Sequence, residues 1–108
     1  MSASVAYTLQ MPTIKRTDEF SDWLRNLRDR RAKAKILARI DRLALGNPRD
    51  VAPVGGGISE MRVHEGAGYR IYYVARGEEI IVLLCGGDKG SQPGDIALAK
   101  KIASELEV

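Results

Sequence analysis

Hydrophobic residues in the first half of the chain recur every three or four positions, which is the period of an α-helix. The first stripe is made of Phe20, Trp23, Leu24 and Leu27, and the second of Ile36, Leu37, Ile40, Leu43 and Ala44. Thr17 and Asp29 precede the two stripes and suit the N-cap position, while Pro48 cannot continue a helix. We therefore expect two consecutive helices that form a hairpin, preceded by a short strand over residues 12–16.

The second half of the chain changes to the pattern of β-strands. Residues 58–64, 69–75 and 79–85 are strand-like runs separated by Gly-containing turns, a spacing that suits antiparallel hairpins. A last helical stripe consists of Ile96, Ala99, Ala103 and Leu106. The order β-α-α-β-β-β-α predicts an α+β fold, in which a small, mainly antiparallel sheet carries an N-terminal helical hairpin and a C-terminal helix. We expect these helices on one face and the other face free for function.

The length of 108 residues suits a single domain, which we place over residues 11–108. Residues 1–10 lack the basic start and apolar stretch of a signal peptide, so we expect a short extension ahead of Met11, itself a possible start. The chain has no run of about 18 apolar residues that could cross a bilayer. Its one cysteine, Cys85, cannot form an internal disulfide, and we expect a cytoplasmic protein without membrane contact.

Charge is distributed unevenly along the chain. The net charge is +3, but residues 22–49 hold nine Lys and Arg against three Asp, which gives +6 there and −3 elsewhere. A basic segment of this kind indicates a polyanionic partner, such as a nucleic acid or an acidic protein surface.

Strand alternation brings polar side chains to one face of the predicted sheet. They are Glu60, Arg62 and His64 on one strand, and Arg70 and Tyr72 on the next. Because an arginine that faces the core is unfavourable, Arg62 and Arg70 should project from the open face. Asp88 and Lys89 reach the same region from the end of the third strand.

This set of residue types suits cleavage of RNA without a metal ion. Arg62, Arg70 and Lys89 can stabilise the extra charge on a reacting phosphate. His64 or Asp88 can move protons, a role that contributes about 10²–10⁴-fold to rates.

Structural roles stay open for several of these residues. His64 lies just before a Gly-rich turn, where a solvated surface histidine is common. Arg62 and Arg70 can instead be ion-pair partners of Glu60 and Glu65.

Other side chains divide between the two predicted faces. Tyr72 can stack an unpaired base, whereas Tyr69 and Tyr73 suit the core. Cys85 suits packing, and Gly55-Gly56-Gly57 lacks the Lys-Ser/Thr of a phosphate loop and suits a flexible lead-in to a strand. One histidine, one cysteine and scattered acids form no recognisable ligand set, so we expect no metal and no cofactor.

Three segments in order resemble the RelE/ParE toxin superfamily. They are Thr17-Asp18-Glu19-Phe20 with Trp23-Leu24, then Glu60-Met61-Arg62-Val63 leading to Gly68-Tyr69-Arg70-Ile71-Tyr72-Tyr73, and finally Gly86-Gly87-Asp88-Lys89 with Gln92 and Asp95-Ile96-Ala97. Within the superfamily they are most similar to the HigB-like branch of addiction module killer proteins. The resemblance extends from Met11 to Leu106.

The resemblance implies a RelE-like microbial RNase-type fold and the toxin of a type II toxin–antitoxin pair. Such relatives are mostly ribosome-dependent endonucleases that cut mRNA in the decoding site without a metal, and so inhibit translation. Arg70 matches the family's Gly-Tyr-Arg arginine, which contacts the scissile phosphate, while Arg62 and Lys89 match other basic positions. The implied partners are the ribosome, mRNA and a cognate antitoxin, a small helix-turn-helix protein of the HigA type.

In this interpretation the basic face of the predicted hairpin contacts ribosomal RNA phosphates. The residues concerned are Arg28, Arg30, Arg31, Lys33, Lys35 and Arg39.

The sequence departs from these relatives at its C-terminal end, where a catalytic Tyr or His is often present. Neither follows Lys89 here, so proton transfer would fall to His64, Asp88, Tyr72 or ribosomal RNA. Two other functions keep the fold: a ParE-like inhibitor of DNA gyrase without nuclease activity, and an inactive toxin that serves only as its antitoxin's co-repressor. The convergent cations argue against the gyrase inhibitor.

Overall fold

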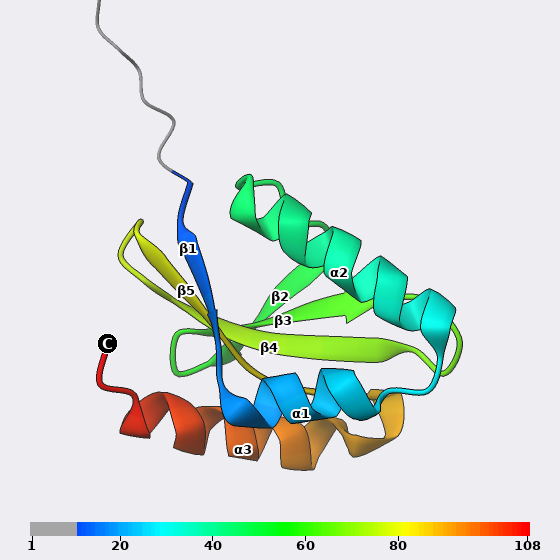
Figure 1. The fold of residues 1–108 in the computed structure, drawn as a ribbon. Helices are drawn as coiled ribbons and strands as arrows, with labels where there is room; N and C mark the ends of the chain where they lie inside the picture. The colour runs from blue at the N-terminus through cyan, green and yellow to red at the C-terminus, as the bar shows by residue number, and fades with distance from the viewer. Residues whose placement is uncertain (1–10) are drawn as a thin grey trace, which may run out of the picture.

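The computed structural model describes residues 11–108, so the predicted N-terminal extension over residues 1–10 lies outside the described part. The elements are β1 (Thr13–Arg16), α1 (Asp18–Asn26), α2 (Arg30–Ala44), β2 (Val51–Gly55), β3 (Ile58–Val63), β4 (Tyr69–Arg76), β5 (Ile80–Asp88), the 3-10 turn η1 (Lys89–Ser91) and α3 (Gln92–Glu105). Figure 1 shows the arrangement, which confirms the predicted α+β fold with its central meander and C-terminal helix.

The helices begin where the sequence predicts. Thr17 Oγ1 accepts a hydrogen bond from Phe20 N at 3.0 Å, and Asp29 Oδ1 accepts one from Ala32 N at 3.0 Å. Both side chains therefore cap free N–H groups of a first helical turn. After α2 the chain turns through Gly46, whose φ is 79°.

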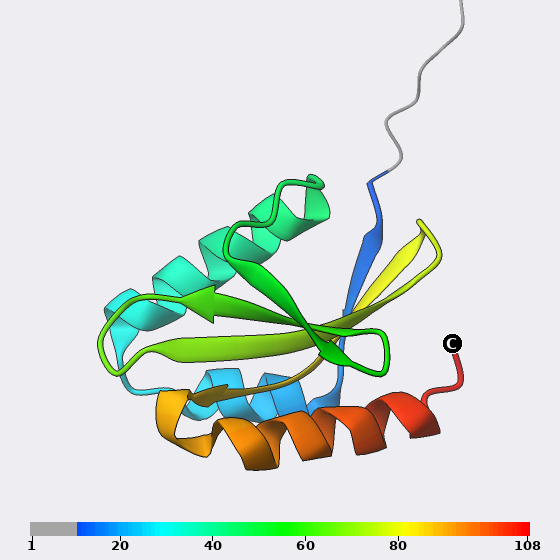
Figure 2. The ribbon, with the colours of Figure 1, turned by 180° about the vertical axis from the view of Figure 1, so that it is seen from behind.

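The five strands form one sheet in the order β1-β5-β4-β3-β2. β1 is parallel to β5, and the other neighbours are antiparallel. Figure 2, seen from behind, shows the β2–β3 hairpin at the front of the sheet.

β2 is a strand that the sequence pattern did not reveal. It contains Pro53, which cannot donate a ladder hydrogen bond and so is restricted to edges such as this one. The glycines Gly55, Gly56 and Gly57 lead directly into β3, as expected, and their flexibility stays a prediction. They form the tight turn between β2 and β3, with φ values of 94°, 64° and 77° at Gly55, Gly56 and Gly57.

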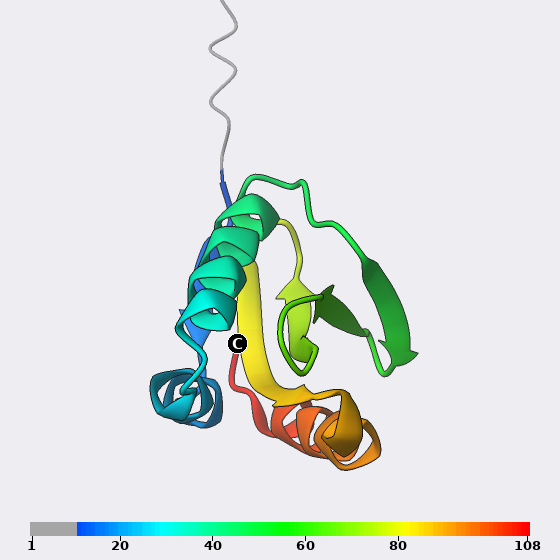
Figure 3. The ribbon, with the colours of Figure 1, turned by 90° about the vertical axis from the view of Figure 1, so that its right-hand side faces the viewer.

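Buried side chains form two cores, one on each face of the sheet. The core under α1 and α2 includes Phe20, Leu24, Ile36, Ile40, Met61, Ile71 and Leu83. The core under α3 includes Ile58, Tyr72, Val74, Val82, Leu84 and Ala99. Figure 3 shows α1 and α2 to the left of β5 and α3 to its lower right.

The expectation that one face of the sheet stays free is therefore wrong. Four consecutive residues of β4, from Ile71 to Val74, are buried, so both faces of this strand need cover. α1 and α2 supply it on one face and α3 on the other, while Arg62 and Arg70 near the β3–β4 turn stay partly exposed.

Candidate functional site

A cavity of about 90 Å³ lies at the end of the sheet where β3 and β4 are joined. Its lining residues are Arg62, Val63, His64, Gly68, Tyr69, Arg70 and Lys89. Four of the five residues predicted to be catalytic are thus brought together: Arg62, Arg70, Lys89 and His64.

Strand register places the two arginines side by side. Arg62 of β3 lies directly opposite Arg70 of β4, and Arg70 lies opposite Gly87 of β5. The side chain of Arg62 is 38% exposed and that of Arg70 is 15% exposed. The predicted common face is confirmed, although Arg70 lies deeper than an open face would allow.

Lys89 and Asp88 follow β5 at the rim of the cavity. The N–H of Lys89 donates to Gly68 O at 3.0 Å, which joins the start of η1 to the β3–β4 turn. Asp88 Oδ1 accepts hydrogen bonds from Gly90 N at 2.8 Å and Ser91 N at 3.1 Å. Asp88 is exposed but acts as the cap of η1, and its catalytic role stays a prediction.

Two glycines let the helices approach this end of β5. A Cβ on Gly86 would lie within 2.6 Å of Trp23 Cδ2, so only hydrogen fits beneath the indole ring of α1. A Cβ on Gly87 would lie 2.7 Å from Ser91 Oγ and would also overlap the carboxylate of Asp95. The Gly86-Gly87 pair therefore allows α1 to pack on one face and α3 to begin on the other.

Glu60 lies behind the arginines, and its side chain is only 1% exposed. Its Oε1 accepts a hydrogen bond from Arg62 Nε at 3.1 Å. Its Oε2 accepts hydrogen bonds from Tyr72 Oη at 3.0 Å and Gln92 Nε2 at 2.7 Å, and lies 3.5 Å from Arg70 Nε. The alternative of arginines paired with Glu60 is therefore confirmed.

The carboxylate of Glu60 is stabilised in its charged form. Burial alone raises its pKa, but hydrogen bonds from Gln92, Tyr72 and Arg62 and the charge of Arg70 outweigh this effect. The pKa of Glu60 consequently lies below its ordinary value, and Glu60 is an anion at neutral pH.

The prediction that Tyr72 stacks an RNA base is wrong. Tyr72 is 0% exposed, belongs to the core under α3, and donates its hydroxyl proton to Glu60. Burial and the contact with Glu60 raise the pKa of Tyr72, so it is also unsuited to accept a proton. Alternation placed Tyr72 on the correct face, but α3 covers that face at this point.

Asp50 is a site residue that the sequence analysis missed. Its Oδ1 accepts a hydrogen bond from Arg62 Nη1 at 3.3 Å, and its Oδ2 contacts His64 Nε2. Asp50 has a φ of 53°, a left-handed conformation that aspartate tolerates better than most residues. The Asn47-Pro48-Arg49-Asp50 turn was the available signal, but a turn alone does not reveal a contact 14 residues away.

The contact between Asp50 and His64 orients the exposed imidazole, whose side chain is 76% exposed. The hydrogen bond to His64 is the main cause that lowers the pKa of Asp50, and the charge of Arg62 adds to it. Asp50 therefore stays ionised beside the imidazole.

Three of the six basic residues proposed for RNA binding make contacts within the protein. Arg39 Nη1 donates to Arg62 O at 2.9 Å, and Arg39 Nη2 donates to Arg49 O. Burial is the main cause that lowers the pKa of Arg39. Lys35 Nζ donates to His64 O at 3.3 Å, and Lys33 Nζ to Arg25 O at 3.4 Å.

The contacts of Arg39 and Lys35 join α2 to the end of β3, so the basic helix reaches residues that line the cavity. Arg28 lies just before α2, Arg30 and Arg31 begin it, and all three are exposed. Their exposure leaves them available to a polyanion, whereas Arg39 is occupied in holding the backbone of Arg62.

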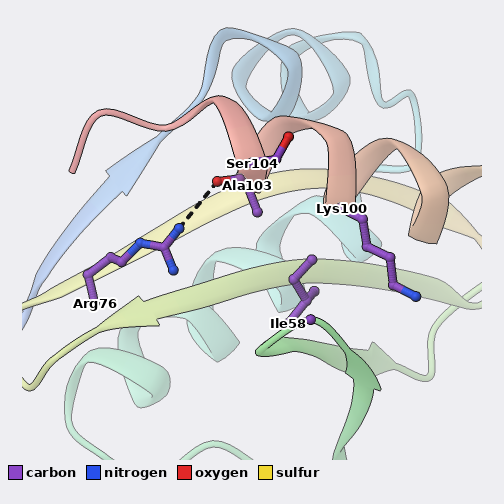
Figure 4. A pocket seen from close by; sticks show the side chains of 6 residues that line it. Ile58, Arg76, Lys100, Ala103 and Ser104 are labelled. Carbon is purple, nitrogen blue, oxygen red and sulfur yellow. Dashed lines mark hydrogen bonds between the residues drawn. The ribbon is translucent and has the colours of Figure 1, made fainter.

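A second cavity of about 320 Å³ lies at the opposite end of β4, beside α3. Figure 4 shows Arg76 on one side of it, Lys100 on the other and Ile58 below. Arg76 Nη2 donates to Ala103 O at 3.2 Å, and Arg76 Nε to Val108 O at 3.1 Å. This arginine therefore caps the C-terminal end of α3, and the larger cavity brings no acid–base pair together.

The remaining candidate groups have structural explanations. Burial raises the pKa of Cys85 to about 12, and its Sγ lies 3.5 Å from Asp95 O, which confirms the packing role. In residues 11–108 no group of three or more His, Cys, Asp and Glu is arranged to hold a metal ion. In the same range no helix is both long and apolar enough to span a membrane.

Fold and site define an α+β protein with a cationic cavity at the accessible end of its sheet. The chain belongs to the family described as Phage derived protein Gp49-like (DUF891), whose model matches residues 22–105. It is 50% identical over 93 residues to an uncharacterized protein of Haemophilus influenzae, an alignment that covers 86% of this chain and 94% of that protein.

The solved structures similar to this chain include the crystal structure of the toxin–antitoxin complex RelBE2 from Mycobacterium tuberculosis. The TM-score is 0.49 at 22% identity, and the alignment covers 73% of this chain and 99% of that chain. The assignment to the HigB-like branch stays a prediction.

Proposed function

We propose that this protein is the toxin of a type II toxin–antitoxin pair and cleaves mRNA on the ribosome. The observation that carries the proposal is the convergence of Arg62, Arg70, Lys89 and His64 on one cavity at an accessible end of the sheet. The three-segment resemblance to HigB-like toxins points to the same reaction. The cognate antitoxin would be a helix-turn-helix protein of the HigA type, and the pair would act in the cytoplasm.

Arg70 is the residue best placed to bind the scissile phosphate. Its side chain is largely buried, lines the cavity, and contacts the carboxylate of Glu60 through Nε. That contact leaves the two terminal nitrogens of the guanidinium for a ligand, and such a fork can donate two parallel hydrogen bonds to phosphate oxygens. Lys89, at the rim, adds a second positive charge where negative charge develops.

His64 is the proposed proton acceptor. It removes the proton from the 2′-hydroxyl, the 2′-oxygen forms a bond to phosphorus, and the bond from phosphorus to the 5′-oxygen breaks. Solvent protonates the leaving oxygen, and the products are a 2′,3′-cyclic phosphate and a 5′-hydroxyl. Asp50 supports this step because its carboxylate contacts Nε2 and orients the imidazole.

The exposed arginines at the start of α2 would contact ribosomal RNA. Arg28, Arg30 and Arg31 belong to the same basic segment as Lys35, which contacts the backbone of His64 at the cavity. Contacts between such side chains and phosphates are independent of sequence and weaken with salt. The division of roles follows from position: the helix provides affinity for the ribosome and the cavity performs the cleavage.

Translation in vitro with mapped mRNA ends tests this proposal. The wild-type protein should cut mRNA at codon-defined positions only when ribosomes are present. Arg70→Ala should bind ribosomes but lose cleavage by at least the roughly 10²-fold typical of a lost group that stabilises transition-state charge. Lys101→Ala, which removes an exposed cation on α3 away from the cavity, is the matched control and should cleave normally.

Two results would contradict the proposal. One is growth arrest by Arg70→Ala equal to that of the wild type. The other is an induced DNA-damage response without mRNA cleavage, which would indicate inhibition of gyrase instead.

A further inference from the structure

Glu60 is an anion buried beside the residues proposed to bind an anion. Its side chain is 1% exposed and contacts Arg62 and Arg70 from β3 and β4, Tyr72 from β4, and Gln92 from α3. A carboxylate next to a phosphate site repels the phosphate, so its presence needs a compensating role.

Glu60 contacts each of the two arginines through the inner nitrogen of the guanidinium, Nε. Arg62 Nε donates a hydrogen bond to Oε1 at 3.1 Å, whereas Arg70 Nε is buried and lies 3.5 Å from Oε2, an ion-pair distance. Because a guanidinium is a rigid planar fork, holding Nε determines where its two terminal nitrogens lie. For Arg70 this contact leaves the terminal nitrogens beside the cavity that its side chain lines.

We propose that Glu60 is a positioning residue, which holds the inner nitrogens of Arg62 and Arg70 so that the outer nitrogens of Arg70 bind phosphate in the cavity. Gln92 and Tyr72 fix the carboxylate itself from α3 and β4. The identity of this phosphate as an RNA phosphodiester rests on the proposed function, whereas the positioning of the arginines does not.

Positioning and simple charge balance predict opposite effects of removing the negative charge. If Glu60 only neutralises the arginines, Glu60→Gln should bind phosphate more tightly, because the site becomes more positive. If Glu60 positions them, binding should weaken. The amide introduced by Glu60→Gln would place its NH₂ group against Arg62 Nε in one orientation and against Arg70 Nε in the other.

The experiment is a titration of the full chain with inorganic phosphate, followed through the arginine Nε–H signals by NMR. Glu60→Gln should weaken phosphate binding at least fivefold. Glu60→Asp, which keeps the charge but shortens the side chain by one methylene, should weaken it similarly. Glu78→Gln, a change to an exposed carboxylate in the β4–β5 turn, is the control and should bind as the wild type does.

Several outcomes would overturn the proposal. Tighter binding by Glu60→Gln, or wild-type binding by Glu60→Asp, would assign Glu60 to charge balance. Failure of the proposed function looks different, because the wild type would then cut no mRNA on ribosomes while the phosphate titration still ranks the variants as predicted.

A measurement on the wild type keeps the proposal testable if both variants fail to fold. The Nε–H proton of Arg62 should remain visible at pH 7.5 because it is hydrogen-bonded to Glu60, and that of Arg70 because it is buried beside the same carboxylate, while those of exposed Arg28 and Arg30 exchange with water. Exchange of the Arg62 and Arg70 signals as fast as the Arg28 signal would refute the positioning role.

Discussion

Replacement of Tyr72 by phenylalanine removes a single hydroxyl from the contact between β4 and the buried carboxylate of Glu60. Tyr72 is fully buried, and its hydroxyl donates to Glu60 Oε2 at 3.0 Å. A hydrogen bond to a charged partner contributes about 1.5–3 kcal/mol to folding stability. Gln92 remains bound to the same oxygen at 2.7 Å, so the carboxylate keeps a donor and the loss should lie near the lower end.

Urea unfolding at neutral pH measures this effect. The urea midpoint of Tyr72→Phe should fall, while the slope of the free energy of unfolding against urea concentration stays unchanged, since the surface exposed on unfolding is the same. Tyr69→Phe is the matched control. Tyr69 lies on the same strand at the cavity, and its hydroxyl makes no hydrogen bond within residues 11–108. The free energy of unfolding of Tyr69→Phe should therefore differ from that of the wild type by less than about 0.5 kcal/mol.

The two interpretations of Tyr72 differ clearly in this assay. A tyrosine that stacks RNA bases from an exposed face tolerates phenylalanine, because both side chains present an aromatic ring. Unchanged stability in Tyr72→Phe would therefore refute the burial of the hydroxyl against Glu60.

Two further predictions concern packing and pH. Gly86→Ala should lower the free energy of unfolding measured in urea by about 1–3 kcal/mol, because the new Cβ overlaps Trp23. Gly94→Ala is the control and should cause no such loss, because a Cβ added at Gly94 meets no neighbouring atom within 4 Å. Folding lowers the pKa of Glu60 from its ordinary 4.5, so this contribution to stability is complete above pH 4.5 and is lost as pH falls through the folded value. Unfolding curves from pH 7 to 3 should show that loss, and a Glu60→Gln variant that declines as steeply would contradict it.

Local sequence signals predicted most of the fold. Thr17 and Asp29 were identified as N-caps because each needs only a backbone N–H three residues ahead. The edge strand β2 was missed because Pro53 and the following glycines remove the alternation by which a strand is recognised.

The residues of the candidate site likewise divide into those that the sequence predicted and those that only the structure showed. Arg62 and Arg70 were placed on one face by alternation, and their direct pairing in the register confirms it. Asp50 could not be found from the sequence, and Gln92 was named there only as part of the family resemblance, without a role at the site. Each contacts the site across a separation of 12 or more residues, which only the packing of β2 and α3 creates.

By itself, the sequence determined the order of the helices and of the strands other than β2, and the side of each predicted strand on which a residue lies. Both follow from backbone periodicity and local capping, which depend on near neighbours. Only the tertiary structure decided which side is covered. α3 packs over the face shared by Glu60, Tyr72 and Arg70 and ends that cover at Gln92, so Tyr72 is buried, Glu60 becomes an internal anion and Arg70 faces the cavity. Burial depends on which distant element occupies a face, and periodicity carries no information about that.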